Sequence, residues 1–570
     1  MNRRALAAGA LVWTVAVTLL VAPSTAAAKR YWVPYTGTLA VEGHGYGHGR
    51  GMSQYGAEGA ARAGKSTGQI LDFYYRGTKS GKTGGPLRVL VTKDTTSQVT
   101  VAARRKLAVR DLADGRAWRL PRRPKIDQWR ITPARGQAVK SAVQFHNRAG
   151  WQRWPVPGRT LLRGVGQFTA GGAPIGLVLP NGEVRRYRGI LRATPPYRGA
   201  GIRDTVNVVS LDQYVRGVLP AEMPTSWSMA ALRAQAVAAR TYAAYGRRAN
   251  RSRYWHVCDT TTCQVYGGVR AETKRGNQAV LGTARTIRKW HGRPALTQFS
   301  SSSGGWTVSG GRPYLRARAD RFDGWQGNAN HRWRTRVDSA RLERRFGELG
   351  RLQHLTVRNR DGHGAWGGRV QQVVLHGRRR TVGLSGESLR FALGLRSSWV
   401  TFGKPPIIAA WQRLGGAKKS PFGRPIGAES RVRNDNGLTG ARHAFTKGRM
   451  YWSKRTGAHG LRGAVLTYYQ RHGGVRSSLG FPNHPYAKTD GGGHKAQFQG
   501  GAVIHHDRWG AHAVTGRILR AYRRHGFVNG RLGYPTTEVR RIDVGRRVKF
   551  QHGRITWLRR SGQIDVDISR

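Results

Sequence analysis

The chain has few acidic residues and almost no cysteine. Its 570 residues include 28 Asp and Glu against 99 Lys and Arg, which gives a formal net charge of +71. With only 2 cysteines it cannot build a dense disulfide framework, so its stability has to come from ordinary packing. The basic residues run from end to end, and such a protein is attracted to polyanions. Because high-GC coding also enriches arginine over lysine, the charge indicates an anionic environment and not a specific ligand.

Long apolar runs are also missing, except at the N-terminus. Arginines precede an apolar stretch from Ala5 to about Val21, and a run of small residues ends at Ala28. This order is typical of a secretory signal, so we predict a signal peptide at 1–28 and a secreted protein. An uncleaved anchor is the alternative, although the stretch barely reaches the roughly 20 residues that a membrane span needs. No later segment is apolar enough to cross, so we expect no stable transmembrane anchor.

The length and the local patterns indicate several domains that contain both helices and strands. A chain of 570 residues is too long for one core. Short β-branched runs between turn residues predict a strand-rich part over 85–200. After Pro224, an alanine-rich stretch predicts a long helix that begins after Ser228 and stops near Gly246. We therefore assign the chain to the α+β class.

The C-terminal part repeats itself three times. The copies contain Phe422-Gly423-Arg424-Pro425, Leu479-Gly480-Phe481-Pro482 and Leu532-Gly533-Tyr534-Pro535. Imperfect copies of this kind predict stacked units that share a core. We expect a linker at 403–408 and a small repeat module at 409–570. The copies resemble LGFP repeats, which occur on exported actinobacterial proteins and imply binding to the wall or envelope.

The most informative acidic residue is Glu222, which lies between Pro220 and Pro224. Each proline fixes its own φ and restricts the residue before it. A carboxyl group on such a stiffened turn, next to apolar Met223, is expected to have a raised pKa and to suit a general acid. Taken alone, Glu222 fits an ordinary glutamate of a loop or a first helical turn better than a catalytic acid.

Several segments around Glu222 resemble the stage II sporulation protein D family of peptidoglycan lytic transglycosylases. They occur in this order in the sequence: 214–217, 218–224, 234–242, 258–268 and 300–307. With gaps, the resemblance extends over roughly 35–400. It implies a mixed catalytic domain at 29–402, with its core at 205–400 and with the strand-rich part at 85–200 as small insertions.

The resemblance also implies a chemistry. In that family one glutamate protonates the glycosidic oxygen between MurNAc and GlcNAc, and the C6 hydroxyl of MurNAc attacks C1 to leave a 1,6-anhydro end. The matching residue is Glu222, and one carboxylate suffices because the nucleophile belongs to the substrate. Gln235 matches a position that hydrogen-bonds sugar hydroxyls or N-acetyl groups. Arg240 matches one that steadies the carboxylate or the lactyl group, with a solvated helix arginine as the alternative.

A glycine- and histidine-rich motif occupies 43–57. Its alternating glycines allow close approach of the backbone and leave His48, Gln54 and Tyr55 as functional groups. No lysine follows it, so it is not a phosphate loop. It matches the family motif that lines the substrate groove, but it comes early instead of late, as if the domain were circularly permuted. The groove can still assemble, because the termini of a domain often lie close together.

The serine run and the cysteine pair have less specific patterns. The serines at 300–303 lack a G-x-S-x-G elbow, so we assign Ser302 to a loop that binds substrate in the groove. Cys258 and Cys263 are close in a chain predicted to be exported, which favours a disulfide. Some family members bind zinc near this segment, so zinc at His256, Cys258 and Cys263 is the alternative. Otherwise we expect no cofactor.

The resemblance therefore predicts a secreted lytic transglycosylase that is tethered to the envelope and acts on peptidoglycan glycan strands. Anionic wall polymers are the expected further partners, and nucleic acid is excluded by the predicted export. The first alternative is a non-catalytic wall-binding protein that enhances a wall amidase. The second is a polyanion-binding envelope protein. The joint presence of Glu222, Gln235 and Arg240 favours the enzyme.

Overall fold

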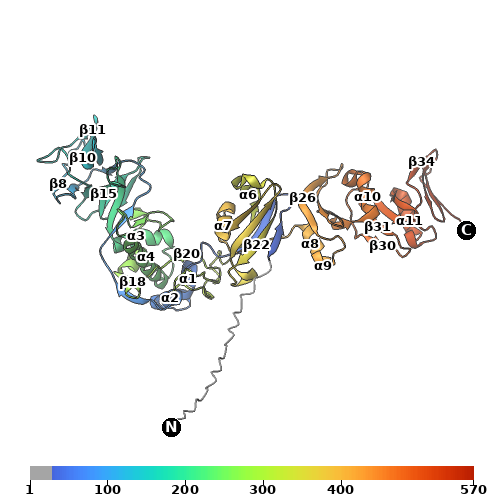
Figure 1. Cartoon of the computed structure of the whole chain (residues 1–570), viewed down its shortest axis with the longest axis horizontal. Coiled ribbons are helices and arrows are strands. Elements are labelled where there is room, and N and C mark those ends of the chain that lie inside the picture. Colours follow the sequence, from blue (N-terminus) through green and yellow to red (C-terminus); the bar gives the residue numbers. More distant parts are fainter. Residues whose placement is uncertain (1–27, 570) are drawn as a thin grey trace, which may run out of the picture.

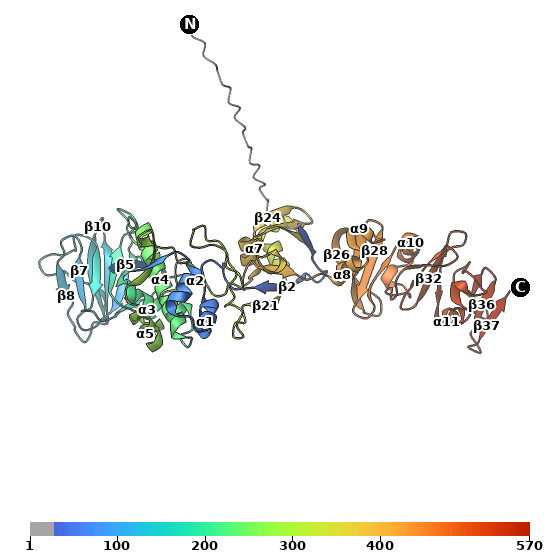
Figure 2. The ribbon, with the colours of Figure 1, turned by 90° about the horizontal axis from the view of Figure 1, so that it is seen from below.

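The computed structural model describes residues 28–569. The predicted signal peptide, 1–28, lies outside these residues except for Ala28. In Figures 1 and 2 the chain is elongated, and two packed bodies are followed by a row of repeat units that ends at the C-terminus. In the described part of the chain, no helix is both long and apolar enough to span a membrane.

Two largely antiparallel sheets form the strand-rich part of the first body, as predicted for 85–200. Their alternating patterns explain the packing: in β9, for example, Trp129 and Ile131 are buried between partly exposed neighbours. The seven-stranded sheet has the order β17-β5-β16-β15-β12-β7-β8, and the six-stranded sheet has the order β11-β10-β9-β6-β13-β14. The strands are β5 Pro86–Leu90, β6 Val99–Ala102, β7 Ala108–Asp111, β8 Ala117–Arg119, β9 Gln128–Ala134, β10 Gln137–Asn147, β11 Gly150–Arg153, β12 Gly166–Thr169, β13 Ile175–Val178, β14 Val184–Tyr187, β15 Ile190–Thr194, β16 Asp204–Ser210 and β17 Val257–Cys258.

A helical layer packs beside the seven-stranded sheet. The alanine-rich stretch forms α4, which begins after Ser228 as predicted but continues past Gly246. Gly246 serves close packing instead of ending the helix, because a Cβ there would lie 2.9 Å from Val257 Cγ1. The helices are α1 Gln54–Arg62, α2 Thr67–Tyr74, α3 Leu211–Glu222, α4 Met229–Ala249 and α5 Lys274–Leu281. Small sheets complete this body: β3 Met52–Ser53 with β20 Phe299–Ser300, and β4 Lys79–Lys82 with β18 Thr286–Trp290 and β19 Arg293–Pro294.

The second body is built from both ends of the region predicted as one catalytic domain. Residues 29–44 supply β1 and β2, which pair with strands from 332–402. These segments have their own hydrophobic cluster, so 29–402 forms two cores instead of one. In Figure 1 the blue N-terminal strand lies within the yellow sheet. The elements are β1 Lys29–Trp32, β2 Thr38–His44, β21 Arg332–Asp338, α6 Ala340–Arg345, β22 Leu352–Arg360, β23 Val370–Gly377, β24 Thr381–Ser385, α7 Gly386–Leu393 and β25 Val400–Phe402.

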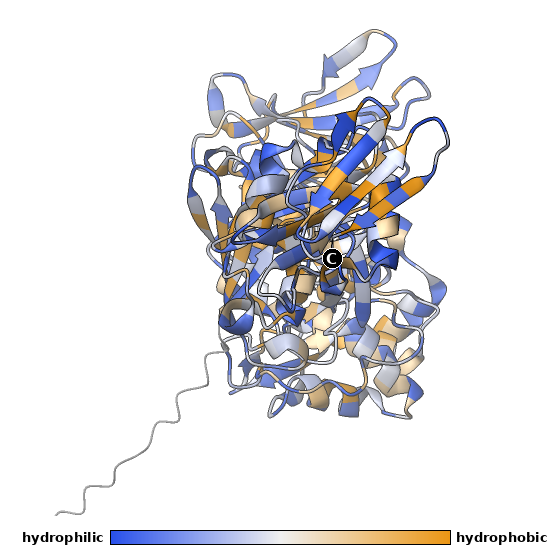
Figure 3. Cartoon of the chain, turned by 90° about the vertical axis from the view of Figure 1, so that its right-hand side faces the viewer, coloured by the Kyte–Doolittle hydropathy of each residue, from blue (hydrophilic) through white to orange (hydrophobic). Residues whose placement is uncertain are grey.

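The repeat module consists of four-stranded antiparallel sheets, each preceded by a helix. Helix α8 begins at Pro406, inside the predicted linker 403–408, because proline suits the first turn of a helix. Around the C-terminus, Figure 3 shows strands that alternate hydrophobic and hydrophilic residues. The elements are α8 Pro406–Arg413, α9 Gly416–Lys419, β26 Pro425–Arg433, β27 Thr439–Phe445, β28 Gly448–Ser453, β29 Gly457–Leu461, α10 Gly463–Arg471, β30 Ala487–Lys488, β31 His494–Gln497, β32 Gly501–His506, β33 Gly510–Thr515, α11 Gly516–Arg524, β34 Arg540–Ile542, β35 Gly545–Phe550, β36 Gly553–Leu558 and β37 Ile564–Ile568. Short 3₁₀ helices lie at Gly268–Ala271, Gly347–Leu349, Ala365–Gly367, Gly474–Arg476 and Phe527–Asn529.

One hydrogen bond recurs in all three repeats and explains their sequence pattern. An aromatic side chain near the end of each helix donates to the carbonyl oxygen of the motif glycine. That glycine has a positive φ of 76°, 67° or 68°, which favours glycine over other residues. The pairs are Trp411 Nε1 to Gly423 at 2.8 Å, Tyr469 Oη to Gly480 at 2.7 Å and Tyr522 Oη to Gly533 at 2.6 Å.

The first repeat contacts the second body through buried titratable groups. The ring of Trp32 lies 4.7 Å from His354 and 5.0 Å from His443. Neither ring nitrogen of His443 has a hydrogen-bond partner among the described residues, and burial lowers its pKa to about 4. Glu429 accepts from the Tyr35 N–H at 3.4 Å, and burial raises the pKa of Glu429 to about 7. The two groups therefore respond to acid with opposite signs.

We predict that substitutions at these two positions change the pH dependence of stability in opposite directions. Because the pKa of His443 is lower in the folded chain, the unfolded chain takes up the proton first. The free energy of unfolding therefore decreases as the pH falls from 6.5 towards 4. Protonation of Glu429 favours the folded chain, so acid relieves the cost of its burial between pH 7 and 4.5. Each contribution amounts to about 3 kcal/mol over its window.

The check is thermal melting of the whole chain between about pH 7 and about pH 5. Relative to the unsubstituted chain, Glu429→Gln should lose more stability on acidification, and His443→Phe should lose less. Parallel pH profiles for all three proteins would contradict this assignment.

Candidate active site

Glu222 is the last residue of α3, where Pro224 stops the helix from continuing. It is half-buried, and Oε1 accepts a hydrogen bond from the Val265 N–H at 3.0 Å. Burial raises the pKa of Glu222, while the Val265 N–H and the nearby Gln54 amide lower it by less. Gln54 Nε2 itself has no partner within hydrogen-bond distance among the described residues, so the Gln54 amide acts on Glu222 from slightly further away. The side chain therefore has the raised pKa that a general acid needs.

The loop that carries Val265 is held by a disulfide. Cys258 and Cys263 are bonded, with their Cα atoms 5.4 Å apart. The thiolates that the zinc alternative requires are therefore not available in this structure. His256 lies against Arg88, with Nδ1 3.1 Å from the Arg88 backbone nitrogen, and burial lowers the pKa of His256 to about 4. In the described residues, no group of three or more His, Cys, Asp and Glu side chains could hold a metal ion.

The early glycine motif lies next to the serine run in space. Strand β3 pairs in parallel with β20, with Met52 opposite Phe299 and Ser53 opposite Ser300. The motif and the serine segment therefore lie side by side, although about 250 residues separate them in the chain. This placement brings the start of α1, with Gln54, towards Glu222. The motif and the serine segment are thus neighbours in the fold, and the circular permutation stays a prediction.

An aromatic cluster surrounds Tyr55, the residue that follows Gln54 in the chain. The ring of Tyr55 on α1 is 4.8 Å from Trp227, which follows α3, and 6.2 Å from Trp325. All three side chains are only partly buried. Trp325 Nε1 donates to the Tyr55 carbonyl oxygen at 2.9 Å, which fixes the cluster. Partly exposed aromatic faces of this kind suit the C–H faces of sugars.

The structure does not bring His48 to Glu222. Its Nδ1 accepts from the Arg50 N–H at 2.9 Å, within the same loop. Burial and then Arg50 and Arg369 lower the pKa of His48 to about 4. The neighbours of His48 are thus charged groups of the second body, and His48 is placed where the two bodies meet.

Ser302 is fully buried and does not line an open groove. Its hydroxyl donates to Asp323 Oδ2 at 2.8 Å, and Asp323 also accepts from Ser53 Oγ at 2.6 Å. In this conformation the hydroxyl is committed to a buried carboxylate, so the substrate contact stays a prediction. Ser302 instead helps to hold Ser53, the N-cap of α1.

Gln235 and Arg240 are also inaccessible, both with 0% exposure. Arg240 donates to Asp212 Oδ1 at 2.6 Å and to the carbonyl oxygens of Val280 and Thr286, so it is a packing residue and not a solvated helix arginine. Neither amide atom of Gln235 has a partner among the described residues. In this conformation both side chains lie inside the core, and their substrate contacts stay predictions.

Sequence reasoning missed Trp227, Trp325, Val265 and Asp323. Trp227 could have been found from its position five residues after Glu222, in the same turn-rich segment. Trp325 and Asp323 come from a distant loop with no periodic pattern. Val265 acts through its backbone N–H, so the identity of its side chain gives no indication of this contact.

Comparisons with known proteins agree with this architecture. A family model described as stage II sporulation protein matches residues 200–290, which include Glu222, and the LGFP repeat model matches 422–477, 479–530 and 532–567. The chain thus contains a stage II sporulation protein domain and a C-terminal module of LGFP repeats. The glycine motif and Ser302 lie outside the matched residues.

Relatives cover parts of the chain. An uncharacterized protein of Brachyspira hyodysenteriae is 43% identical over 115 residues, 20% of this chain and 31% of that protein. The amidase enhancer of Bacillus subtilis is 40% identical over 120 residues, 20% of this chain and 16% of that protein. Stage II sporulation protein D of Bacillus amyloliquefaciens is 28% identical over 264 residues, 41% and 70% of the two chains. The chain thus spans about a third and a sixth of the first two relatives, and the matches indicate a cell-wall-related function.

We predict that loss of the disulfide weakens the site without unfolding the first body. Replacing both Cys258 and Cys263 by serine removes a short loop closure, which costs roughly 2 kcal/mol. The Val265 N–H is then held less firmly, so the pKa of Glu222 should rise further. Thermal melting measures the first effect, and carboxyl chemical shifts of labelled glutamate against pH measure the second. An unchanged titration of Glu222 would show that the loop keeps its position without the disulfide.

Proposed function

We propose that this chain is a secreted, envelope-bound lytic transglycosylase that cleaves peptidoglycan glycan strands with Glu222 as its acid and base. The observation that supports this best is the isolation of Glu222. Neither a second carboxylate nor a cation is among the groups that shift its pKa, and among the described residues it forms no ion pair. A hydrolase of the two-carboxylate kind would need a partner acid.

The proposed reaction uses one proton donor and no water. The Glu222 carboxyl group gives its proton to the glycosidic oxygen, and the bond from that oxygen to C1 of MurNAc breaks. The Glu222 carboxylate then takes the proton of the C6 hydroxyl while O6 bonds to C1. The acid is thereby restored, and the product carries a 1,6-anhydro end. The cluster of Tyr55, Trp227 and Trp325 would position the sugars by stacking, and the LGFP repeats would keep the enzyme at the envelope.

A second candidate is a non-catalytic wall protein that enhances an amidase. It is supported by the relative named amidase enhancer, which is 40% identical over 120 residues. The inaccessibility of Gln235 and Arg240 also fits this candidate, since neither can contact substrate in this conformation. A non-catalytic enhancer has no use for a partly exposed acid with a raised pKa. We therefore prefer the enzyme to the enhancer.

The test is digestion of peptide-stripped peptidoglycan glycans, read by mass spectrometry. The unsubstituted chain should release 1,6-anhydroMurNAc ends, and Glu222→Gln should lower their yield by at least about a hundredfold, as expected for a lost general acid. Glu348→Gln, at an exposed glutamate of the second body, is the matched control and should keep full activity. The rate should fall as the pH rises through the pKa of Glu222, because only the protonated acid can donate.

Other outcomes would exclude the mechanism. Reducing-end sugars would mean hydrolysis by a water nucleophile. If neither protein cleaves but both stimulate a wall amidase equally, the chain is an enhancer and Glu222 is not catalytic.

A further inference from the structure

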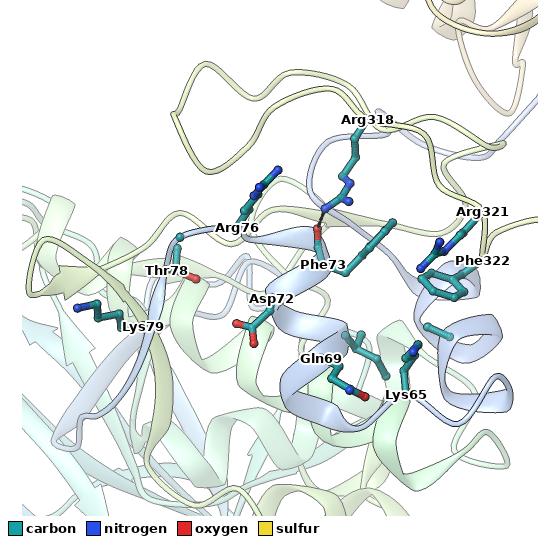
Figure 4. Close-up of a pocket in the computed structure, with 13 residues that line it drawn as sticks. Lys65, Gln69, Asp72, Phe73, Arg76, Thr78, Lys79, Arg318, Arg321 and Phe322 are labelled. Carbon is teal, nitrogen blue, oxygen red and sulfur yellow. Dashed lines mark hydrogen bonds between the residues drawn. The ribbon is translucent and has the colours of Figure 1, made fainter.

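A basic groove runs along the helical layer of the first body, apart from Glu222. One cavity of about 670 Å³ lies between α2, the start of β4 and the loop at 318–322 (Figure 4). A second cavity of about 480 Å³ adjoins it and is bordered by the loop at 313–318. Phe73, Arg76 and Arg318 line both cavities, so the two are continuous. Glu222 lines neither.

The groove has a large excess of positive charge. Its cations are Lys65, Arg76, Lys79, Arg316, Arg318 and Arg321. None of them has a carboxylate partner within ion-pair distance among the described residues. The acidic side chain of the lining, Asp72, is paired with Arg288. Burial and then the like charge of Arg76 lower the pKa of Arg318, while Asp320 raises it by less.

Two of these cations, Arg318 and Arg321, lie against aromatic rings. The Arg318 guanidinium lies 3.7 Å from the ring centre of Phe73 and donates to the Phe73 carbonyl oxygen, and Arg321 lies 5.0 Å from the ring of Phe322. In Figure 4, Arg318 and Arg321 approach the cavity from the loop, while Lys65 approaches it from the turn between α1 and α2 and Gln69 from α2. Cations from the loop at 318–322 and from the segment before α2 therefore face the same cavity.

We propose that this groove binds a phosphodiester-linked polymer of the cell wall, such as a polyol phosphate chain. A phosphodiester presents anionic oxygens in different directions, so cations from opposite walls can contact the same group. The continuity of the two cavities fits a chain of anions better than a single ion. The half-buried rings of Phe73 and Phe322 provide apolar contact for the carbon units between phosphates.

The groove is linked to the candidate active site by shared elements. Helix α1 carries Tyr55 in the aromatic cluster and Ala60 in the wall of the groove. The loop that carries Arg318 and Arg321 continues to Trp325, which contacts Tyr55. A polymer in the groove would therefore hold the first body at the wall with Glu222 close by. This placement rests on the proposed function, whereas the binding itself does not.

The test measures binding of the mature chain to poly(glycerol phosphate) by calorimetry at about 50 mM and about 200 mM salt. The variant Arg76→Gln/Arg321→Gln should bind about tenfold more weakly and show a smaller salt dependence, because two phosphate contacts are lost. The matched control, Arg344→Gln/Arg345→Gln, removes the same charge from exposed arginines of α6 and should bind within about twofold of the unsubstituted chain. Melting temperatures of all three proteins verify folding.

Two results would overturn the proposal. Equal weakening by both double variants would mean that net charge, and not the groove, attracts the polymer. Equally tight binding of a polycarboxylate glycan, with the same loss in Arg76→Gln/Arg321→Gln, would assign the groove to carboxylates instead of phosphodiesters. Binding is read without turnover, so absence of glycan cleavage would refute the proposed function and leave this result intact. Unchanged cleavage of phosphate-free glycan by the groove variant confirms that the two sites are separate.

Discussion

The arrangement of the site depends on one buried carboxylate, Asp323, which joins segments that are far apart in the sequence. The side chains of Ser53, Ser302, Asn328 and His331 donate to it, as do the N–H groups of Ser303 and Gly304. Burial alone would raise the pKa of Asp323, but these hydrogen bonds outweigh it and hold the pKa below its usual range. A buried charge that is this well satisfied fixes its neighbours, since removing one donor leaves an unpaired group. Helix α1 begins directly after Ser53, so the positions of Gln54 and Tyr55 follow from this interaction.

This arrangement shows which parts of the site the sequence could predict. The raised pKa of Glu222 was accessible to prediction, because Pro220, Met223 and Pro224, from which it was inferred, are its neighbours in the chain. The disulfide and the helix that begins after Ser228 are local for the same reason. The functions of Ser302 and Arg240 were not accessible, because burial depends on distant partners such as Asp323 and Asp212. A motif that resembles a family's site contains packing residues as well as residues that touch substrate, and only the fold separates them.

The division of the chain into cores follows the same principle. The α+β class could be predicted from local patterns, and the recurring aromatic-to-glycine hydrogen bond explains why the repeats were visible in the sequence. The second body could not be predicted from the sequence, because its sheet pairs β1 with β22 across more than 300 residues. Short strands such as β1 have no pattern that names their partner, and pairing is decided by where the hydrophobic cluster closes. The bodies meet near His48, which explains why a residue of the glycine motif has charged neighbours from the second body.

The electrostatics of Glu222 are notable in a chain with 99 basic residues. An arginine within about 4–6 Å would lower the pKa of this carboxyl group and leave it without a proton to donate. Arg240, in the helix that follows Glu222, is not among the groups that shift the pKa of Glu222. Its guanidinium is occupied inside the core by Asp212 and by nearby carbonyl oxygens. What reaches Glu222 instead is a backbone N–H and a neutral amide, which orient the carboxyl group at a small cost to its pKa. The arginine of the next helix is thus paired with Asp212, and the pKa of Glu222 stays raised in a chain rich in cations.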